Sequence, residues 1–371
     1  MRIGILTFHL GNNYGGILQC YALQQVLLGL GHSVEVINYS NTCQRGFFQK
    51  LHAKFSTANS IAGFLHTIFE MVVRHKAFSY DKSLNDASLK EFDKFRECYL
   101  NISQPLDAST IGEYANAHYD LVITGSDQVW TSLFDEPLVY MADWKPRFVG
   151  KRMSYAACSA YSVIHGKQKN YIRECLNRYD YITVRDKTSQ SLVHSITGVA
   201  PEVVPDPSLL YGYEEFLTKQ PQEPYILTYI LGDEIKNGHA LALKRIKEAV
   251  GNYPVYSIVI PCNNQEIIKY SDKVFETCSP GLWVNMFYHA TYVYTDSFHA
   301  IMFALKFQKP FTAYYKNIVR SSRLKNLKDM GIASIYEDAR SISSVMEVYS
   351  ENIVKRGFDF NDLMNRVSKN K

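Results

Sequence analysis

The chain has 371 residues, of which 46% are hydrophobic and 20% charged, so it exceeds the ~100–200 residues of an ordinary domain and predicts two domains. Its 40 Lys and Arg against 36 Asp and Glu give a net charge of +4, and the interspersed charges argue against a nucleic-acid partner. No apolar run of ~18 residues is present to span a bilayer, and residues 1–8 lack the features of a signal peptide. We therefore expect a soluble, cytoplasmic protein.

Seven cysteines lie at positions 20, 43, 98, 158, 175, 262 and 278, and no two have the two-residue spacing typical of zinc and redox sites. We expect buried free thiols, because unpaired cysteine commonly packs as a small apolar residue. Neither a metal site nor a cofactor is expected.

The first forty residues have the pattern of a βαβ unit. An apolar run at Ile3–Phe8 is followed by a Gly/Asn turn, by helical spacing over Ile17–Leu28 and by a second apolar run at Val34–Tyr39. Residues 42–110 carry helix-like spacing and few strand signals, so we predict a helical insertion there. Its helices are expected at Phe55–Lys76 and Ser88–Leu100.

Strand and helix signals alternate along the rest of the chain, which is typical of parallel sheets in α/β proteins. In the first half, further strands are expected at Tyr119–Thr124, Arg152–Ala157, Tyr181–Val184 and Glu202–Val204. In the second half, strands are expected at Tyr225–Leu231, Val255–Ile260, Val274–Thr277, Tyr292–Thr295 and Phe311–Tyr315, and helices at Ile235–Val250, Leu282–His289, Phe298–Phe307 and Ser321–Met330.

These elements predict an α/β fold of two Rossmann-like domains that face a cleft. The first covers residues 1–210 with its insertion at about 42–110, and the second covers 222–340 after a linker over Tyr211–Pro224. Residues 341–371 are expected to close the chain with a helix, placed at 341–356. Ligands of open α/β sheets bind at the carboxyl ends of the strands, so the site is expected to use both domains.

A glycine-rich loop, Gly11-Asn12-Asn13-Tyr14-Gly15-Gly16, lies between the first predicted strand and helix. Free backbone N–H groups and the helix dipole favour an anion there, which makes Asn13, Gly15 and Gly16 candidate substrate-binding residues. The spacing does not match a dinucleotide fingerprint, and no acidic residue ends the second strand. The alternative interpretation is a tight turn that only starts the helix.

A second motif, Thr124-Gly125-Ser126-Asp127-Gln128-Val129-Trp130, directly follows a predicted strand. Ser126 is a candidate substrate-binding residue and Asp127 a candidate base, although either residue alternatively serves as a helix N-cap.

Arg185, in Thr183-Val184-Arg185-Asp186, ends another predicted strand. Its guanidinium either binds a phosphate or carboxylate bidentately or forms a local pair with Asp186.

The segment Tyr294-Thr295-Asp296-Ser297-Phe298-His299-Ala300 predicts a strand-to-helix turn with a histidine in the first helical turn. The helix dipole disfavours the cationic form of His299, which suits proton transfer near neutral pH. Arg320 and Arg323 lie three residues apart on one helix face, where they either bind an anionic substrate or form a solvated face.

Together these motifs resemble the polysaccharide pyruvyl transferase family, over roughly residues 1–335. The resemblance is carried by Asn13-Tyr14-Gly15-Gly16 with Leu18–Gln24, by Gly125–Trp130, by Val184-Arg185-Asp186, by Asp206-Pro207-Ser208 and by Asp296–His299. It implies a GT-B-like architecture and the transfer of a pyruvyl group from phosphoenolpyruvate to a glycan as a ketal, in cell-surface polysaccharide biosynthesis. It also implies that Arg185 and the Ser297–His299 turn belong to the donor site.

On this interpretation His299 protonates the donor methylene and Asp127 deprotonates the attacking hydroxyl. Similar family members have Arg-Leu-His where this chain has Ser297-Phe298-His299, so Arg320 or Arg323 is expected to replace the missing arginine.

The expected partners are phosphoenolpyruvate and a glycan or lipid-linked sugar acceptor, with peripheral but no integral membrane association. Two alternatives stay open: a nucleotide-sugar glycosyltransferase of the same architecture, and a non-catalytic glycan-binding protein.

Overall fold

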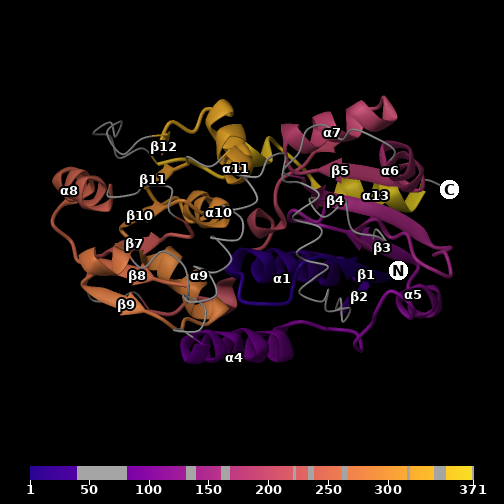
Figure 1. Ribbon diagram of the computed structural model, residues 1–371, viewed down its shortest axis with the longest axis horizontal. Coiled ribbons are helices and arrows are strands. Elements are labelled where there is room, and N and C mark those ends of the chain that lie inside the picture. The colour runs from indigo at the N-terminus through magenta and orange to yellow at the C-terminus, as the bar shows by residue number, and fades with distance from the viewer. Residues whose placement is uncertain are drawn as a thin grey trace, which may run out of the picture.

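Two six-stranded parallel sheets, one in each half of the chain, form the centre of the molecule (Figure 1). The computed structural model describes residues 1–39, 82–130, 139–159, 168–219, 223–232, 238–260, 266–315, 318–337 and 348–369. Helices flank both sheets, so the predicted α/β fold of two Rossmann-like domains is confirmed.

The first sheet has the strand order β2-β1-β3-β4-β5-β6. Its strands are β1 (Arg2–Leu6), β2 (Ser33–Val36), β3 (Leu121–Thr124), β4 (Lys151–Ala157), β5 (Tyr181–Val184) and β6 (Glu202–Val203). The helices of this half are α1 (Tyr14–Gly29), α4 (Lys82–Tyr99), α5 (Ile111–His118), α6 (Gln168–Leu176) and α7 (Lys187–Thr197). The central strand β3 is buried along its whole length, as its continuous apolar sequence predicts for a parallel strand covered on both faces.

The second sheet has the order β12-β11-β10-β7-β8-β9. Its strands are β7 (Ile226–Tyr229), β8 (Val255–Ile258), β9 (Lys273–Phe275), β10 (Tyr292–Thr295), β11 (Phe311–Tyr314) and β12 (Ile335–Tyr336). The remaining helices are α8 (His239–Val250), α9 (Pro280–His289), α10 (Phe298–Lys306), α11 (Ile318–Asp329), α12 (Asn352–Lys355) and α13 (Phe360–Lys369). Strand order reverses between β7 and β10 here and between β1 and β3 in the first sheet, which places two ligand-binding edges in the molecule.

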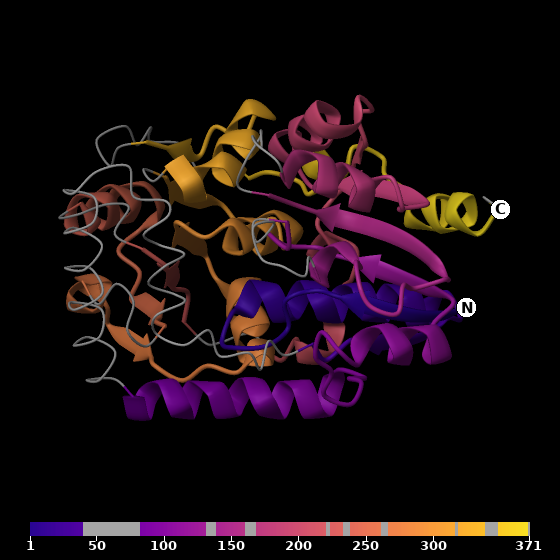
Figure 2. The same ribbon diagram turned by 45° about the vertical axis from the view of Figure 1, so that its right-hand side comes forward.

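Helix α1 lies between the two sheets and packs on both (Figure 1). The Tyr14 ring stacks on Trp283 of α9 with centroids 5.6 Å apart, and its hydroxyl donates to the Cys278 carbonyl at 2.7 Å. Figure 2 shows α4 running beneath both halves, and its Phe92 ring lies 4.7 Å from Tyr14. The first turn of α1 is therefore held by side chains from both domains.

The end of the chain returns to the first domain, because α13 packs beside the first sheet (Figure 1). Its apolar face joins the core of that domain, and Lys151 Nζ donates to the Val367 carbonyl at 3.0 Å. The described part of the helix predicted over 341–356 contains only α12, which ends where Arg356 and Gly357 adopt positive φ angles of 47° and 73°. Residues 341–347 lie outside the described residues.

The predictions for individual helices and cysteines are confirmed in part. Helix α4 matches the prediction at Ser88–Leu100 but begins six residues earlier, and α5 was not predicted. Cysteines 20, 158, 175 and 278 are buried free thiols as expected, whereas Cys98 is exposed. Cys43, Cys262 and the helix predicted at Phe55–Lys76 lie outside the described residues.

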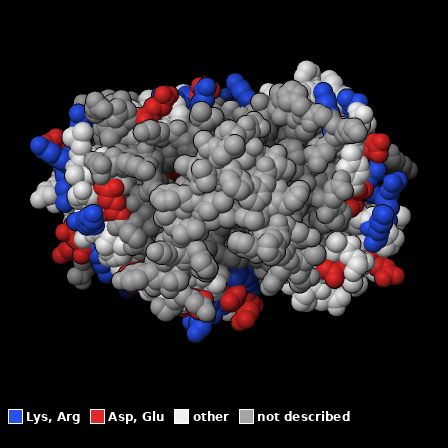
Figure 3. Space-filling view, in the orientation of Figure 1, with Lys and Arg blue, Asp and Glu red and all other residues white. Residues whose placement is uncertain are grey.

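The described surface mixes positive and negative side chains. In Figure 3, Lys and Arg lie beside Asp and Glu around the rim of this face, which fits the interspersed charges of the sequence. Among the described helices, none combines the length and apolarity needed to cross a bilayer.

Candidate functional site

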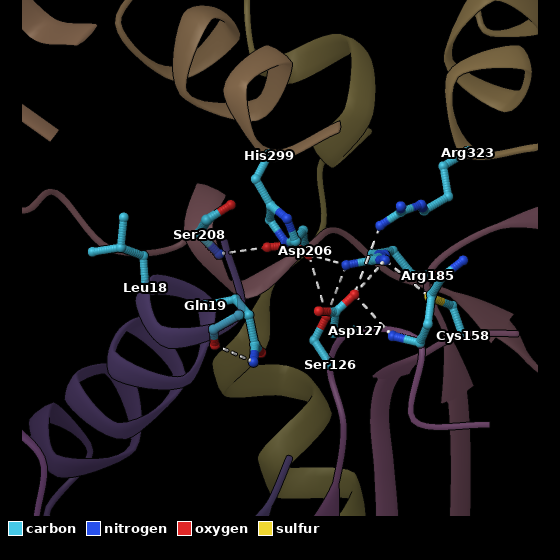
Figure 4. Close-up of polar contacts among 12 residues, drawn as sticks. Leu18, Gln19, Ser126, Asp127, Cys158, Arg185, Asp206, Ser208, His299 and Arg323 are labelled. Carbon is cyan, nitrogen blue, oxygen red and sulfur yellow. Dashed lines mark hydrogen bonds and ion pairs between the residues drawn. The ribbon is translucent and has the colours of Figure 1, made fainter. Parts of the chain in front are cut away.

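Loops that follow strands in both domains bring charged side chains into one buried cluster (Figure 4). Ser126 and Asp127 follow β3, Arg185 follows β5, and His299 stands in the first turn of α10 after β10. Strands β3 and β10 each border the point where the strand order of their sheet reverses. The cluster therefore occupies the edge where ligands bind in open α/β sheets.

Arg185 is the centre of this charge cluster and is only 7% exposed. Its Nη1 donates to Asp206 Oδ2 at 2.6 Å, and its Nη2 lies 3.4 Å from Asp127 Oδ1 and 2.9 Å from Cys158 Sγ. Burial alone lowers the pKa of Arg185, but Cys158, Asp206 and Asp127 together raise it above its usual value. The guanidinium is therefore a fixed positive charge that two carboxylates balance.

Asp186, the alternative partner of Arg185, has another role. Its carboxylate caps α7 by accepting the backbone N–H of Ser189 at 2.8 Å. Asp186 thus acts as the N-cap of α7, and Arg185 forms its ion pairs with other residues of the cluster.

Asp127 lies between two arginines, one from each domain. Its Oδ1 is 3.4 Å from Arg185 Nη2 and 3.7 Å from Arg323 Nη1 of α11. Asp127 adopts a φ angle of 71°, an uncommon backbone conformation that recurs at functional sites. Burial raises the pKa of Asp127, but Arg185, His299 and Arg323 lower it below its usual value, so the carboxylate is ionised.

One aromatic ring lies close to both guanidinium groups. The central carbons of Arg185 and Arg323 lie 4.5 Å and 5.5 Å from the centroid of Phe298. These distances allow cation–π attraction to both groups, so the ring helps to hold two like charges near each other.

His299 connects α1 of the first domain with the cluster. Its Nε2 lies 3.6 Å from Asp206 Oδ2, whose second oxygen accepts the backbone N–H of Ser208 at 3.0 Å. A Cβ atom on Gly15 would lie 2.0 Å from His299 Nδ1, so only glycine lets the ring pack against the backbone of α1. Burial raises the pKa of Asp206, but His299 and Arg185 lower it well below its usual value.

A polar framework fixes the loops beneath the cluster. Thr7 Oγ1, after β1, donates to the Ser126 carbonyl at 2.8 Å and accepts from Gln19 Nε2 at 3.0 Å. On the second domain, the Asp296 carboxylate accepts the backbone N–H groups of Leu231 and Gly232 at 2.6 Å and 2.9 Å. Both strand ends are thus held by hydrogen bonds before any ligand arrives.

The structure brings together six of the residues predicted for the site, namely Gly15, Ser126, Asp127, Arg185, His299 and Arg323. Asn13 and Ser297 instead cap α1 and α10, with their side chains accepting the N–H groups of Gly16 at 3.1 Å and Ala300 at 3.4 Å. Gly16 lines a separate cavity beside α1. The side chain of Arg320 lies outside the described part of the chain.

Sequence reasoning missed three members of the cluster. Asp206 belongs to a motif that carries the family resemblance, but no role was predicted for it, and neither Cys158 nor Phe298 was a candidate. Asp206 and Cys158 both follow predicted strands, and Phe298 lies between Ser297 and His299. For Asp206 and Cys158, the position after a predicted strand was therefore a signal that the sequence contains.

Three nitrogen atoms in the cluster are buried without a hydrogen-bond partner among the described residues: Nε of Arg185, Nε of Arg323 and Nε2 of His299. Unpaired buried donors are rare, and each costs free energy. Two arginines and a histidine with unused capacity form a site suited to an anionic ligand beside a proton donor.

Comparison with known protein families identifies the family of this chain. A family model described as polysaccharide pyruvyl transferase matches residues 13–315. The chain belongs to the polysaccharide pyruvyl transferase family. In this family member, the matched segment contains the cluster from Gly15 to His299, whereas Arg323 lies beyond it.

This pyruvyl transferase family member is similar in fold to one solved structure at a TM-score of 0.50, and two others have lower scores. The UDP-GlcNAc 2-epimerase of Methanocaldococcus jannaschii is similar with a TM-score of 0.50 and 11% identity, covering 99% of each chain. The UDP-GlcNAc 2-epimerase of Neisseria meningitidis has a TM-score of 0.45 and 9% identity, covering 100% of this chain and 94% of its own. The E. coli heptosyltransferase has a TM-score of 0.39 and 11% identity over 100% of both chains. A search of curated proteins finds no match.

Proposed function

We propose that this protein transfers a pyruvyl group from phosphoenolpyruvate to two hydroxyls of a glycan or lipid-linked sugar, forming a ketal. The observation that carries the proposal is the convergence of Arg185, Arg323 and His299, each with an unpaired buried nitrogen among the described residues. Phosphoenolpyruvate carries both a phosphate and a carboxylate, so it needs two cationic groups close together. Membership of the family supports the same donor.

In the proposed complex, Arg185 and Arg323 bind the two anionic groups of the donor. The α10 N-terminus adds partial positive charge, which favours an anion at this end of the helix. The Ser297-Phe298-His299 turn lacks the arginine of similar family members, and Arg323 supplies a guanidinium in its place. This replacement is supported by Phe298, since its ring lies near the guanidinium groups of both Arg185 and Arg323.

The reaction requires a proton at the methylene carbon of the donor. We assign this proton to Nε2 of His299, which faces Asp206 across 3.6 Å and has no hydrogen-bond partner among the described residues. Protonation gives the central carbon oxocarbenium character, and a sugar hydroxyl then attacks it. A second hydroxyl replaces phosphate and closes the ketal.

Asp127 and Asp206 balance the positive charges of the site. Asp127 was the expected base, but its carboxylate already faces Arg185 and Arg323, and its lowered pKa makes it a weak proton acceptor. We therefore propose that Asp127 positions the two arginines for the donor.

Thermal-shift measurements test the donor class. Phosphoenolpyruvate at 100 times its dissociation constant is expected to stabilise the protein by ~2.7 kcal/mol, whereas nucleotide sugars are expected to give no shift. Stabilisation by nucleotide sugars alone would favour a glycosyltransferase instead. Phosphate release from phosphoenolpyruvate in the presence of acceptor glycans then separates an enzyme from a glycan-binding protein.

Replacing His299 tests the proton donor. His299→Asn keeps a polar side chain of similar size but cannot supply a proton, so turnover should fall by roughly 10²–10⁴ while donor affinity changes little. His118→Asn, at an exposed position of α5, is the matched control. Wild-type turnover in the folded His299→Asn variant would give the role of acid to another group.

A further inference from the structure

Phe298, the first residue of α10, is 7% exposed and lies beside both arginines of the charge cluster. The centroid of its ring is 4.5 Å and 5.5 Å from the central carbons of Arg185 and Arg323. The centroid of the His299 ring is 5.3 Å away. One uncharged side chain thus lies next to the two cations and the proton donor of the proposed reaction.

The turn that carries Phe298 is fixed by hydrogen bonds. Ser297 caps α10 by accepting the N–H of Ala300 at 3.4 Å, and its own N–H donates to Thr295 Oγ1 at 3.0 Å. Thr295 Oγ1 in turn donates to the Tyr229 carbonyl at 2.5 Å. Because the turn is held by the ends of β7 and β10, the ring has a fixed position against which the arginines pack.

The two guanidinium groups are held to different extents. Arg185 donates to Asp206 at 2.6 Å, whereas Arg323 is linked to the cluster by its ion pair with Asp127 at 3.7 Å and by the Phe298 ring. Burial lowers the pKa of Arg323, Asp127 raises it, and the nearby charge of Arg185 lowers it further. A second cation at this place therefore needs an attractive partner to hold it.

Of these two partners of Arg323, the ring is the one that can stay in place when an anion binds. Asp127 is itself negatively charged, so an anionic ligand competes with it for the guanidinium groups. Phe298 has no charge, and it attracts a guanidinium through the π-electrons of its ring. The ring can therefore maintain the spacing of the two arginines with and without a ligand.

The space between the arginines is small. The same atom, Asp127 Oδ1, lies 3.4 Å from Arg185 Nη2 and 3.7 Å from Arg323 Nη1, so a single oxygen is near both cations. Two anionic groups that take its place need to lie close together, as they do when a phosphate ester and a carboxylate share one carbon atom. A longer dianion would pair with one arginine and leave the other without a counter-charge.

We propose that Phe298 determines donor specificity, because its ring keeps Arg185 and Arg323 at the spacing of a ligand whose phosphate ester and carboxylate are attached to the same carbon. The inference rests on the proposed function, in which these two arginines bind the donor. Phe298 acts here as a positioning residue, and the arginines make the contacts to the ligand. Single anions and dianions with several carbons between their charged groups are selected against.

Calorimetric titration with unreactive ligands tests this specificity without turnover. In 2-phosphoglycolate both groups are attached to one carbon, 4-phosphoryloxybutanoate has two further methylene groups between them, and inorganic phosphate is a single anion. The wild type should bind 2-phosphoglycolate at least tenfold more tightly than either of the others. Phe298→Leu should bind 2-phosphoglycolate about tenfold more weakly than the wild type does and the other two ligands within about twofold, because two cation–π contacts are lost.

Two further variants separate the effect of the ring from a general loss of packing. Phe298→Tyr keeps the ring and should retain the preference of the wild type. Phe275→Leu in β9 is the matched control, since the Phe275 ring also lies beside a cation, Lys273, at 4.9 Å but belongs to another part of the second sheet. It should leave the binding of all three ligands unchanged.

The selectivity ratio decides the role of the ring. An unchanged ratio in folded Phe298→Leu, or an equal loss of affinity for all three ligands, overturns the inference, and so does a lost preference in folded Phe298→Tyr. Where circular dichroism shows that Phe298→Leu is unfolded, Phe298→Met is measured with the same expectations.

The inference and the proposed function can fail separately. A wild type that turns over phosphoenolpyruvate but does not prefer 2-phosphoglycolate to the longer dianion overturns the inference alone. A preference that depends on the ring, in a protein that releases no phosphate from phosphoenolpyruvate with any acceptor glycan, supports the inference and overturns the proposed transfer.

Discussion

At the scale of single residues, the site depends on contacts between groups far apart in the chain. Arg185 pairs with Asp206, twenty-one residues later, and with Asp127, fifty-eight residues earlier, rather than with its neighbour Asp186. Two carboxylates, two guanidiniums and one imidazole thus occupy a buried space from which water is largely excluded. Such a cluster is stable only while its charges are paired, and a ligand that brings two negative charges can rearrange that pairing.

Gly15 is expected to be essential because of the His299 ring, not because of the helix. Gly15→Ala would place Cβ 2.0 Å from Nδ1, so the ring must turn away, and turnover should fall about 10²-fold or more while α1 stays folded. Gly29→Ala at the other end of α1 meets no atom within 4 Å and is the matched control. Steady-state rates with circular dichroism measure both, and a fully active Gly15→Ala would contradict the placement of His299.

Arg185 is expected to carry both donor binding and stability. Arg185→Lys keeps the charge but loses the planar fork, so the donor KM should rise about tenfold or more, since a charge-assisted hydrogen bond contributes about 1.5–3 kcal/mol. Arg185→Ala leaves Asp206 without its partner and should lower the free energy of unfolding by about 3–5 kcal/mol. Donor kinetics and urea unfolding are the measurements, with the exposed Arg147→Lys as control. A raised acceptor KM with an unchanged donor KM would place Arg185 in the other subsite.

Sequence patterns identified the residue types of the site but not their partners. Strand-end position was enough to select Asp127, Arg185 and His299, because parallel strands deliver their carboxyl ends to one edge. The same signal was available for Asp206, which follows the last strand of the first sheet, but it does not show that Asp206 pairs with Arg185, because pairing depends on how the loops after β5 and β6 meet.

At the scale of elements, predictions succeeded where one periodic segment decides the structure. The alternation of apolar runs and helical spacing located the strands of both sheets to within a few residues, except β12 (Ile335–Tyr336), which was not predicted. The prediction missed α13, although Phe360, Leu363, Met364 and Val367 have the spacing of one buried helix face. The local sequence therefore indicates the helix, whereas its position beside the first sheet depends on tertiary packing.

Helix α13 is expected to stabilise the first domain substantially. Leu363 is 0% exposed and packs in the same core as Ile3 and Ile5, so Leu363→Ala should lower the free energy of unfolding by about 2–5 kcal/mol. Leu241→Ala in α8, at a position 39% exposed, should change it by less than about 0.5 kcal/mol. Urea denaturation checks both values, and equal effects of the two substitutions would show that α13 adds little to the core.

At the scale of the whole molecule, ion pairs of the cluster cross from one domain to the other. Asp127 and Asp206 belong to the first domain, whereas Arg323 and His299 belong to the second. Together with the stacking of Tyr14 on Trp283, these contacts hold the two sheets against α1. Acid that protonates the carboxylates is therefore expected to weaken the contact between domains as well as the site.

The pH dependence of stability tests this arrangement through Asp206. The pKa of Asp206 in the folded protein lies well below the ordinary value near 3.8. Its contribution to the free energy of unfolding is therefore fully present above that pH. The contribution is lost as the pH falls, because the unfolded chain binds a proton at a pH where the folded protein does not. Asp206→Asn should therefore be less stable than the wild type at pH 7 by about 3 kcal/mol. Below pH 4 its free energy of unfolding should fall less steeply than that of the wild type, by up to about 1.4 kcal/mol per pH unit. The measurement is urea unfolding at pH 7, 4 and 3.

Glu113→Gln, at an exposed position of α5, serves as the control, because an exposed carboxylate contributes little to this slope. The same comparison separates a local effect from one on both domains. If the cluster couples the domains, the wild type should unfold in one transition at pH 7, whereas Asp206→Asn should show two transitions at the same pH. Identical acid slopes in Asp206→Asn and the wild type would mean that the Asp206 carboxylate is not held by Arg185 and His299 in solution, and the proposed donor site would lose its charge-balancing partner.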